Sequence, residues 1–595
     1  MEEKNLLEVK DLTIAFFRGA EKLTVVDELT FTIKRGETLG LVGESGSGKT
    51  VTALSILRLI PFPDGKIQNG IILLHDPGKP SIDLVQLEEK EVRKIRGKRI
   101  AMIFQEPMTS LNPVISCGKQ VAEVLTRHTN LTNKAARERT LDLFEETRLP
   151  RPREIFSSYP HELSGGQKQR VMIAMAIACH PDLLIADEPT TALDVTVQKT
   201  ILGLLKEIQE KYGMSILFIT HDLAVVARIA DRVLVMYKGK AVEENSTRLL
   251  FHAPAHPYTQ GLINSRPPAN IRLKKLPTVD DFSGSKEIAG NPERDIRQLF
   301  SAGNIETTEE RLMRHLAIYS RHPILEVKNL STRFATSVSL TGRPKQYIKA
   351  VENVTFEVYP GEVLGIVGES GSGKTTLGRT ILNLVKAASG HVIFEKKELS
   401  KLNHEQLREI RKDLQIIFQD PFSSLNPRES IGSALTEPMK VHGMGGNGRM
   451  RKARAIEILR QVGLEEKQFY RYPHEFSGGQ RQRICIARAL TLEPKLIICD
   501  ESVSALDVSV QAQVLNLLNE LKREFHFTYV FISHDLSVVR FMSDRLIVMK
   551  DGSIEEMGST DKIYLNPQST YTRQLIDSIP KFNFPPAGSP TGQEN

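Results

Sequence analysis

The octapeptide Gly-Glu-Ser-Gly-Ser-Gly-Lys-Thr occurs twice in this chain of 595 residues, at 43–50 and at 368–375. Each copy follows a short apolar segment and precedes a helical pattern. A strand, a Gly-rich loop and a helix in this order form the context that the phosphate-binding pattern G-x-x-x-x-G-K-[ST] requires. Because both copies have that context, the sequence predicts two nucleotide-binding sites in one chain.

The residue types of this loop suit phosphate binding. Glycines let backbone N–H groups converge on the phosphates, because a Cβ would hold the anion away, and the following helix adds its positive end. Lys49 and Lys374 are expected to reach the β and γ phosphates, and the hydroxyls of Thr50 and Thr375 to hold Mg²⁺. The predicted nucleotide-binding residues are Gly43, Glu44, Ser45, Gly46, Ser47, Gly48, Lys49 and Thr50, and Gly368, Glu369, Ser370, Gly371, Ser372, Gly373, Lys374 and Thr375.

The loops belong to a repeat of a whole domain. Asp187 and Asp500 lie 313 residues apart, as do His221 and His534. The loop lysines lie 325 apart, whereas Gln105 and Gln419 lie 314 apart, so the first copy has eleven extra residues (325 − 314) before its glutamine. We expect one insertion near 75–83, a stretch with Pro and Gly.

The chain is too long for one hydrophobic core, and the repeat gives its boundaries. We predict domains at 1–264 and 324–580, a linker at 265–323 where Pro, Gly, Asp and Lys increase, and a disordered Pro/Gly-rich tail at 581–595. Within the linker, 309–319 is expected to form a short helix with Leu312, Leu316 and Tyr319 on one face.

The composition is that of an ordinary globular protein, with 40% hydrophobic and 25% charged residues. No apolar run approaches the ~18 residues of a membrane span, and the acidic start is unlike a secretory signal, so a cytoplasmic protein is expected. A net charge of +7 is mild for this length and favours a solvated surface over nucleic-acid binding. The four cysteines have no CxxC spacing and are expected to be reduced core residues.

Two apolar segments each end in an Asp-Glu pair, at Asp187-Glu188 and Asp500-Glu501. A continuous apolar run is typical of a parallel strand buried on both faces, and ligand chemistry gathers at its carboxyl end. Asp187 and Asp500 fit the acid that supports Mg²⁺. We therefore assign Glu188 and Glu501 as the catalytic bases that polarise an attacking water.

Two further apolar segments each end in a histidine, His221 and His534. Each histidine follows the glutamate of its own copy by 33 residues. A lone histidine at a strand end is more often structural, but the equal spacing favours a catalytic contact to the γ-phosphate.

A Ser-Gly-Gly-Gln sequence opens a long helical segment in each copy: Ser164, Gly165, Gly166 and Gln167, and Ser477, Gly478, Gly479 and Gln480. Serine is a good N-cap, but two glycines directly behind it are poor helix formers. The pattern therefore predicts that a ligand approaches the backbone closely at this helix end. That ligand cannot easily be the domain's own nucleotide, which its phosphate loop already holds.

Together these motifs resemble the nucleotide-binding domains of the ABC superfamily, through GESGSGKT, Gln105 and Gln419, LSGGQ and FSGGQ, IADE and ICDE, TALD and SALD, and the two histidines. The resemblance implies an α/β fold of two P-loop domains in tandem, each with a mainly parallel sheet, an antiparallel β subdomain and an α-helical signature subdomain. It also implies Mg²⁺ contacts from Gln105 and Gln419, and adenine stacking on Phe16 or Phe17 and on Phe334.

In that family each ATP lies between the phosphate loop of one domain and the signature helix of the other. The resemblance thus implies two composite sites formed by pairing within the chain. One would join Lys49, Gln105, Glu188 and His221 to Ser477, Gly479 and Gln480, and the other would join Lys374, Gln419, Glu501 and His534 to Ser164, Gly166 and Gln167.

Residues 105–113, 419–427 and 256–259 (His-Pro-Tyr-Thr) look like the dipeptide and oligopeptide importer group, and the fused layout is similar to ATPases of glutathione import and microcin uptake. This implies an ATPase with ATP and Mg²⁺ as cofactors, peripheral at the cytoplasmic face of the membrane. Its partners would be two permease subunits and, through them, an extracytoplasmic binding protein. The alternative is a soluble fused ATPase acting on the ribosome, although the prolines of the linker are unlike the long charged helix typical of that class.

Overall fold

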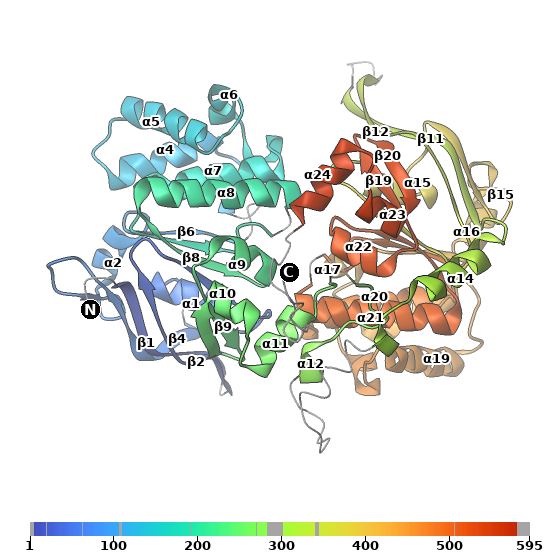
Figure 1. Ribbon diagram of the computed structural model, residues 1–595, viewed down its shortest axis with the longest axis horizontal. Coiled ribbons are helices and arrows are strands. Elements are labelled where there is room, and N and C mark those ends of the chain that lie inside the picture. The colour runs from blue at the N-terminus through green and yellow to red at the C-terminus, as the bar shows by residue number, and fades with distance from the viewer. Residues whose placement is uncertain are drawn as a thin grey trace, which may run out of the picture. The chain divides into compact units, whose positions relative to one another are not determined.

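The computed structural model describes residues 5–19, 21–61, 63–105, 110–191, 193–268, 271–282, 302–338, 344–504 and 506–579. Its contacts divide the chain into two units (Figure 1). Apart from Asp194–Thr196, the first unit runs up to Ile263, and the second runs from Asn264 to Ile579. The described parts of the segment expected as a linker therefore belong, by their contacts, to the second unit.

The first unit is built on a six-stranded sheet with the order β10-β9-β3-β8-β7-β6. All neighbours are parallel except β9 and β10. Every residue of β3, β7 and β8 is buried, as expected for parallel strands covered on both faces. Their carboxyl ends therefore meet at one edge of the sheet. The strands are β3 (Thr38–Val42), β6 (Ile100–Ile103), β7 (Leu183–Asp187), β8 (Ser215–Thr220), β9 (Arg232–Tyr237) and β10 (Lys240–Ser246).

A second, antiparallel sheet has the order β2-β1-β4-β5. Helix α1 (Lys49–Ile56) begins at the loop lysine, and its Ala53 and Ile56 share one core cluster with residues of both sheets. The helix that follows the phosphate loop is therefore fixed by apolar packing on both sides. The strands are β1 (Asn5–Arg18), β2 (Glu21–Lys34), β4 (Gly65–Leu74) and β5 (Ile82–Asp83).

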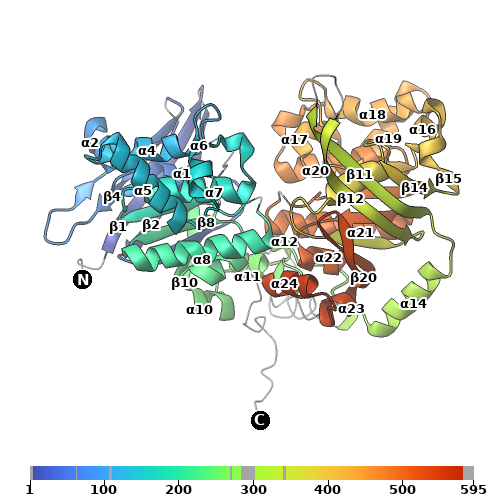
Figure 2. The same ribbon diagram turned by 90° about the horizontal axis from the view of Figure 1, so that it is seen from above.

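Four helices of the first unit, α4 to α7, pack on one another and form a separate helical region (Figure 2). They are α4 (Cys117–His128), α5 (Asn133–Glu146), α6 (Pro152–Ser157) and α7 (Gly165–Ile177). The remaining helices are α2 (Glu89–Ile95), η2 (Pro160–Glu162), α8 (Val195–Tyr212), α9 (Leu223–Ile229), α10 (Thr247–His252) and α11 (Pro257–Asn264).

The second unit repeats this architecture, with sheet orders β16-β17-β18-β13-β19-β20 and β12-β11-β14-β15. The predicted combination of a mainly parallel sheet, an antiparallel sheet and a helical region is thus confirmed in both copies. The strands are β11 (Leu325–Val338), β12 (Pro344–Val358), β13 (Val363–Val367), β14 (Ser389–Phe394), β15 (Lys397–Glu398), β16 (Leu414–Ile417), β17 (Leu496–Asp500), β18 (Thr528–Ile532), β19 (Arg545–Lys550) and β20 (Ser553–Ser559).

The second unit begins with a segment that has no counterpart in the first unit, and its other helices follow the same order as those of the first. That segment holds α12 (Val279–Phe282), η3 (Ala302–Asn304) and α14 (Thr308–Tyr319). The others are α15 (Lys374–Ile381), η4 (Leu399–Lys401), α16 (His404–Ile410), α17 (Pro421–Ser424), α18 (Ile431–Val441), α19 (Gly448–Gln461), η5 (Glu466–Tyr470), η6 (Pro473–Glu475), α20 (Gly478–Leu490), α21 (Val508–Phe525), α22 (Leu536–Met542), α23 (Thr560–Leu565) and α24 (Thr570–Ser578).

The eleven extra residues of the first copy are not one insertion. The β4–β5 connection covers 75–81, whereas the β14–β15 connection covers only 395–396. Five of the eleven residues thus lie in the predicted loop, and the others are spread elsewhere before Gln105. Surface connections tolerate such length changes at little cost in free energy, so nothing forces them into one place.

Helix α14 forms where it was predicted, but the leucines of its apolar face are largely exposed. Leu312 is 59% exposed and Leu316 is 60% exposed. The helix meets the second domain through polar groups: Arg314 Nη2 lies 2.8 Å from Asp544 Oδ1, and the Tyr319 hydroxyl donates to Glu362. An ion pair and a hydrogen bond, rather than the two leucines, therefore hold this helix on the domain.

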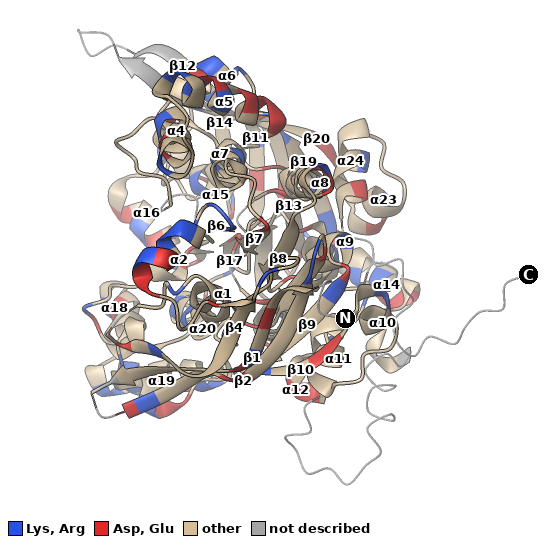
Figure 3. Cartoon of the chain, turned by 90° about the vertical axis from the view of Figure 1, so that its left-hand side faces the viewer, with Lys and Arg blue, Asp and Glu red and all other residues tan. Residues whose placement is uncertain are grey.

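Charged residues of both signs are mixed on the helices, as on α2 (Figure 3). This helix carries Glu89 and Glu91 in its first turn and Arg93 and Lys94 in its last, which complements the helix dipole. Cys117, Cys179, Cys485 and Cys499 are all free thiols, three of them buried and one partly buried. In the part of the chain that the structure describes, no helix is long and apolar enough to cross a bilayer.

The same aspartate in the two copies provides a test of the α14 contact. Asp231 and Asp544 each accept a 2.9 Å hydrogen bond from the backbone N–H that begins the central strand. Asp231 is exposed, whereas Asp544 is 1% exposed and also faces Arg314 and Lys522. Asp544→Asn should cost about 3 kcal/mol of unfolding free energy, because buried cations lose their partner.

Asp231→Asn is the matched control and should cost about 1 kcal/mol or less. Urea unfolding of the two variants of the full chain measures the difference. Equal losses would show that the α14 ion pairs do not stabilise the second unit.

Candidate nucleotide-binding and hydrolysis site

The two phosphate loops have the same backbone shape. Gly43, Gly46 and Gly48 have φ values of 156°, 81° and 100°, and Gly368, Gly371 and Gly373 have 155°, 81° and 97°. A Cβ on Gly48 would also lie 2.8 Å from the carbonyl oxygen of Val25. Only glycine fits these angles and this space, so the loop can turn its N–H groups inward as a phosphate cradle requires.

Polar groups inside each loop are arranged for an anion. Lys49 Nζ donates to the carbonyls of Gly43 (2.7 Å) and Glu44 (2.8 Å), and Lys374 does the same at 2.8 Å in the second copy. The Oγ atoms of Ser47 and Ser372 are buried and have no hydrogen-bond partner. Orphaned hydroxyls at the centre of a Gly-rich loop are what a site for phosphate oxygens would present.

Two of the three predicted Mg²⁺ ligands of each copy, the threonine and the aspartate, lie together. Thr50 Oγ1 is 3.2 Å from Asp187 Oδ1, and Thr375 Oγ1 is 2.9 Å from Asp500 Oδ1. Burial raises the pKa of Asp187 to about 6, against the hydrogen bond from Thr50, and it also raises the pKa of Asp500. A hydroxyl and a desolvated carboxylate are hard oxygen donors that suit Mg²⁺, so these residues fit the ion.

Glu188 is the centre of a hydrogen-bonded network that joins three elements. Its Oε1 lies 3.1 Å from His221 Nδ1, and its Oε2 accepts from Gln105 Nε2 at 3.1 Å and from Thr191 Oγ1 at 2.8 Å. Burial is the largest single influence and favours the neutral acid, but the hydrogen bond and charge of His221, the hydrogen bond from Thr191 and the charge of Lys49 together outweigh it and lower the pKa of Glu188 to about 2. The carboxylate therefore stays ionised and fixed in orientation.

The second copy has a similar network. Glu501 Oε2 accepts from Gln419 Nε2 at 2.8 Å and lies 3.5 Å from His534 Nδ1. Burial opposes the charge of both groups, yet their mutual contact lowers the pKa of Glu501 and raises that of His534. In both copies the predicted metal ligand, Gln105 or Gln419, is bonded to the glutamate.

Both glutamates have a strained backbone that the sequence did not predict. Glu188 and Glu501 each have a φ of 47°, in the left-handed region. Such a conformation costs on the order of 1–3 kcal/mol and persists only where the surroundings impose it. Here each glutamate N–H donates to the neighbouring strand, to Ile219 at 2.8 Å or Ile532 at 3.0 Å. The next residue is Pro189 in one copy and Ser502 in the other, so the proline is not the cause.

The signature sequences form helix N-termini, as predicted. Ser164 caps α7 and exchanges hydrogen bonds with Gln167, and Ser477 and Gln480 do the same on α20. Both serines are exposed. The side chain of each glutamine is thus engaged in the capping box of its own helix.

The second glycine of each signature sequence is explained by packing, not by a ligand as the sequence indicated. A Cβ on Gly166 would lie 2.9 Å from Val197 Cγ1, and one on Gly479 would be closer still to Val510 Cγ1, whereas a Cβ on Gly478 would meet nothing within 4 Å. The second glycine of each pair is therefore required by packing against α8 or α21. Only the first glycine is left for a ligand to explain.

A tyrosine that the sequence did not indicate as a site residue contacts each phosphate loop. The hydroxyl of Tyr258, on α11, accepts a 3.0 Å hydrogen bond from the backbone N–H of Glu44, and that of Tyr571, on α24, accepts a 3.2 Å bond from Glu369. Tyr258 is 1% exposed and packs on Tyr237, with ring centroids 4.2 Å apart and the ring planes tilted by 32°. The matching Pro-Tyr-Thr and Thr-Tyr-Thr sequences were the only signal, and they do not reveal this contact.

The predicted adenine-stacking aromatics differ between the copies. Phe16 packs against the core of the first unit, and Phe17 lies under Lys66 Nζ, 5.8 Å from its ring centroid. Phe334, which aligns with Phe16, is 43% exposed. Phe334 is thus available for stacking, whereas Phe16 serves partly as a core residue.

Comparisons with known proteins agree with these motifs. The sequence model described as ABC transporter matches residues 26–191 and 351–504, and the one described as oligopeptide/dipeptide transporter, C-terminal region, matches 242–287 and 556–594. The second pair of regions contains Tyr258 and Tyr571.

Over 580 residues, the chain is 46% identical to the glutathione import ATP-binding protein GsiA of Salmonella paratyphi A, covering 98% of this chain and 90% of the relative. The protein of the same name in Escherichia coli K12 is 46% identical over 578 residues, with 97% and 90% covered. Among solved structures, a post-hydrolysis dimer of the ATP-binding cassette MJ0796 bound to ADP and Pi is 32% identical over 40% of this chain and 98% of its own, with a TM-score of 0.36.

The packing role of the second signature glycine is testable. Gly479→Ala should lower the unfolding free energy by about 1–3 kcal/mol, because its Cβ forces a stiff valine off its position. Gly478→Ala meets open space and should be neutral or slightly stabilising. Urea unfolding without nucleotide measures both. A neutral Gly479→Ala variant would return both glycines to a purely ligand-binding role.

The tyrosine contact is testable by removing one oxygen atom. Tyr258→Phe keeps the ring that packs on Tyr237 but deletes the acceptor for Glu44 N–H, a bond worth about 1 kcal/mol. We expect several-fold weaker ATP binding to the first copy, since the start of its loop loses its anchor. Equilibrium binding of a fluorescent ATP analogue measures this, with Tyr237→Phe as the control. Unchanged affinity in Tyr258→Phe would show that the bond stabilises the fold only.

Proposed function

The chain belongs to the ABC transporter family, and from this premise we propose that it powers the import of small peptides by hydrolysing ATP in both of its copies. The family membership makes it an ATP-binding protein whose hydrolysis is coupled to transport. The observation that carries the proposal for both copies is that each contains its own Thr-Asp pair and its own Glu-His-Gln network.

The proposed cargo is a short peptide of the size and chemistry of glutathione. The support comes from the relatives, which are named for glutathione import, and from the match to the oligopeptide/dipeptide transporter C-terminal region after each copy. These names favour import over the ribosome-directed alternative. Uptake of labelled glutathione and of a labelled dipeptide, in cells with and without this chain, would test the assignment.

We propose that each hydrolysis site is completed by the signature helix of the other copy. The support is chemical: Ser164 and Ser477 are exposed helix caps, and a Cβ on Gly165 or Gly478 would meet no atom closer than 3.6 Å, which leaves space beside a positive helix end. An anion such as the γ-phosphate suits this position. Each phosphate loop already binds the phosphates of the nucleotide in its own copy, so the signature helix of that copy is not needed at the same nucleotide.

The roles of the side chains follow from their contacts. The loop N–H groups and Lys49 or Lys374 bind the phosphates, while Ser47 and Ser372 donate their free hydroxyls. Thr50 with Asp187, and Thr375 with Asp500, would hold Mg²⁺, which neutralises phosphate charge when it is bound. With a pKa of about 2, Glu188 is a weak base, so we infer that its carboxylate orients the attacking water. His221 holds the Glu188 carboxylate in its orientation.

The partners are membrane permeases, as for any ATP-binding subunit of an importer. We propose two permease subunits and, through them, an extracytoplasmic binding protein, with this chain held peripherally at the cytoplasmic face. The segments beside Gln105 and Gln419 are the proposed contact with the permeases, because each glutamine bonds to a catalytic glutamate and lies at the domain surface.

Replacing both catalytic glutamates tests the hydrolysis mechanism. Glu188→Gln with Glu501→Gln keeps the shape of each network but removes the charge that orients water. We expect ATP hydrolysis to fall at least 100-fold while ATP binding is retained. Phosphate release and binding of a fluorescent ATP analogue are the two measurements.

The control replaces two exposed glutamates that also lie 313 residues apart, Glu207→Gln with Glu520→Gln, on α8 and α21. These changes should leave both measurements as in the unmodified chain. Undiminished hydrolysis in the Glu188→Gln, Glu501→Gln chain would rule out the catalytic assignment.

A further inference from the structure

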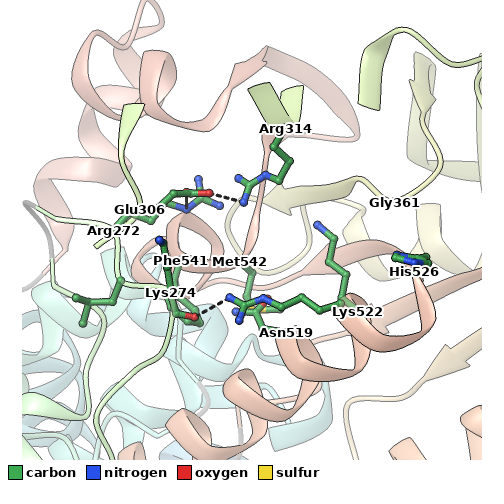
Figure 4. Close-up of a pocket in the computed structure, with 12 residues that line it drawn as sticks. Arg272, Lys274, Glu306, Arg314, Gly361, Asn519, Lys522, His526, Phe541 and Met542 are labelled. Carbon is green, nitrogen blue, oxygen red and sulfur yellow. Dashed lines mark hydrogen bonds and ion pairs between the residues drawn. The ribbon is translucent and has the colours of Figure 1, made fainter. Parts of the chain in front are cut away.

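The second unit contains a pocket that the hydrolysis mechanism does not use. It has a volume of about 330 Å³ and lies between the segment that precedes the second domain and the domain itself (Figure 4). Its size is at the lower end for small-molecule sites. It is lined by Arg272, Leu273, Lys274, Glu306, Arg314, Gly361, Asn519, Lys522, Arg523, His526, Phe541 and Met542.

The lining of this pocket is strongly basic. Arg272, Lys274 and Arg314 come from the preceding segment, and Lys522 and Arg523 come from α21. Lys522 and Arg314 reach toward the same space from opposite sides (Figure 4). Cations on both walls repel one another, so a pocket of this kind is costly unless negative charge lies between them.

The carboxylates nearby do not balance these charges. Glu306 pairs with Arg272 (Nε to Oε2, 3.2 Å) and with Arg314, and Asp544 pairs with Arg314 at 2.8 Å and Lys522 at 3.3 Å. Glu310 pairs with Lys274 at 2.7 Å. Five cations against these three carboxylates leave an excess of two positive charges. Arg311 also meets Glu306, but it has its own partner in Asp561.

One buried cation has a free hydrogen-bond donor at this pocket. Arg272 Nη2 donates to the carbonyl of Ser543 at 2.8 Å, but its Nη1 is buried and has no hydrogen-bond partner. The side chain is 6% exposed, and burial lowers the pKa of Arg272 to about 10, against the pull of Asp544 and Glu306. A desolvated guanidinium with an unused N–H is the kind of group that binds phosphate or carboxylate oxygens.

The first copy shows that the fold does not require these cations. By the constant offset of 313, Lys522, Arg523 and His526 correspond to Gln209, Glu210 and Gly213. In the first copy Gln209 Nε2 simply donates to the carbonyl of Gly36 at 2.9 Å. The basic character therefore appears only in the copy on which the preceding segment packs.

We propose that this pocket binds a small anion with several negative charges, carried on phosphate or carboxylate groups, and that the anion ties the preceding segment to the second domain. Arg272 and Arg314 hold it from one side and Lys522 and Arg523 from the other. Phe541 and Met542 form an apolar floor, which excludes water and strengthens these ionic contacts.

The test is a calorimetric titration of the full chain with inorganic pyrophosphate and, separately, with citrate. Both phosphate loops are first saturated with Mg²⁺ and a non-hydrolysable ATP analogue, so that they take up no probe. We expect one binding event per chain with at least one of the two probes. A response to pyrophosphate alone, or to citrate alone, identifies the preferred group.

The decisive variant gives the second copy the residues of the first, Lys522→Gln with Arg523→Glu. We expect at least tenfold weaker binding of the probe. Lys199→Gln with Lys206→Glu, at exposed positions on α8, makes the same change of charge and should leave binding unaltered. Arg523→Glu alone changes only an exposed residue and should also weaken binding, so the test stands if loss of Lys522 prevents folding.

Absence of binding to the unmodified chain by both probes would overturn the proposal. So would equal affinity in Arg523→Glu and in the unmodified chain. Equal weakening by the Lys199→Gln, Lys206→Glu control would show that only the overall charge of the protein attracts the probe, which also overturns it.

Discussion

The contact between each glutamate proposed as catalytic and a histidine that follows the neighbouring strand is the interaction on which the rest of the site depends. Glu188 and His221, like Glu501 and His534, follow adjacent parallel strands whose ends meet at one edge of the sheet. The contact keeps the glutamate ionised despite its burial. The strained φ of 47° in both copies shows how strongly the surroundings fix this position.

The phosphate loop beside this network is held from two directions. In the first copy, Lys49 Nζ donates to the first two carbonyls of the loop, and the hydroxyl of the buried Tyr258 on α11 accepts a hydrogen bond from the N–H of Glu44, the second loop residue. The segments that match the oligopeptide/dipeptide C-terminal region thus reach the nucleotide site of their own copy. One hydrogen bond in each copy therefore joins the oligopeptide/dipeptide C-terminal region to the phosphate loop.

Much of the architecture could be predicted because it depends on local sequence and on the repeat. The buried apolar strands, the Gly-rich loops and the serine caps each have a strong local signal. Helix α14 could be predicted from its apolar period, but its contact with the second domain could not, because that contact uses Arg314 and Asp544, which no apolar period reveals. The role of Gly479 depends on Val510, and that of Tyr258 on Glu44, and both are tertiary contacts between distant residues.

The central claim is that both copies hydrolyse ATP with equivalent networks. Its most direct test compares Glu188→Gln and Glu501→Gln as single variants, by the rate of phosphate release from the full chain together with its permeases. The two networks share the glutamate, the histidine and the glutamine, with similar contacts among them, so the account predicts equal losses of activity in the two variants. Full activity in one variant and loss in the other would contradict it.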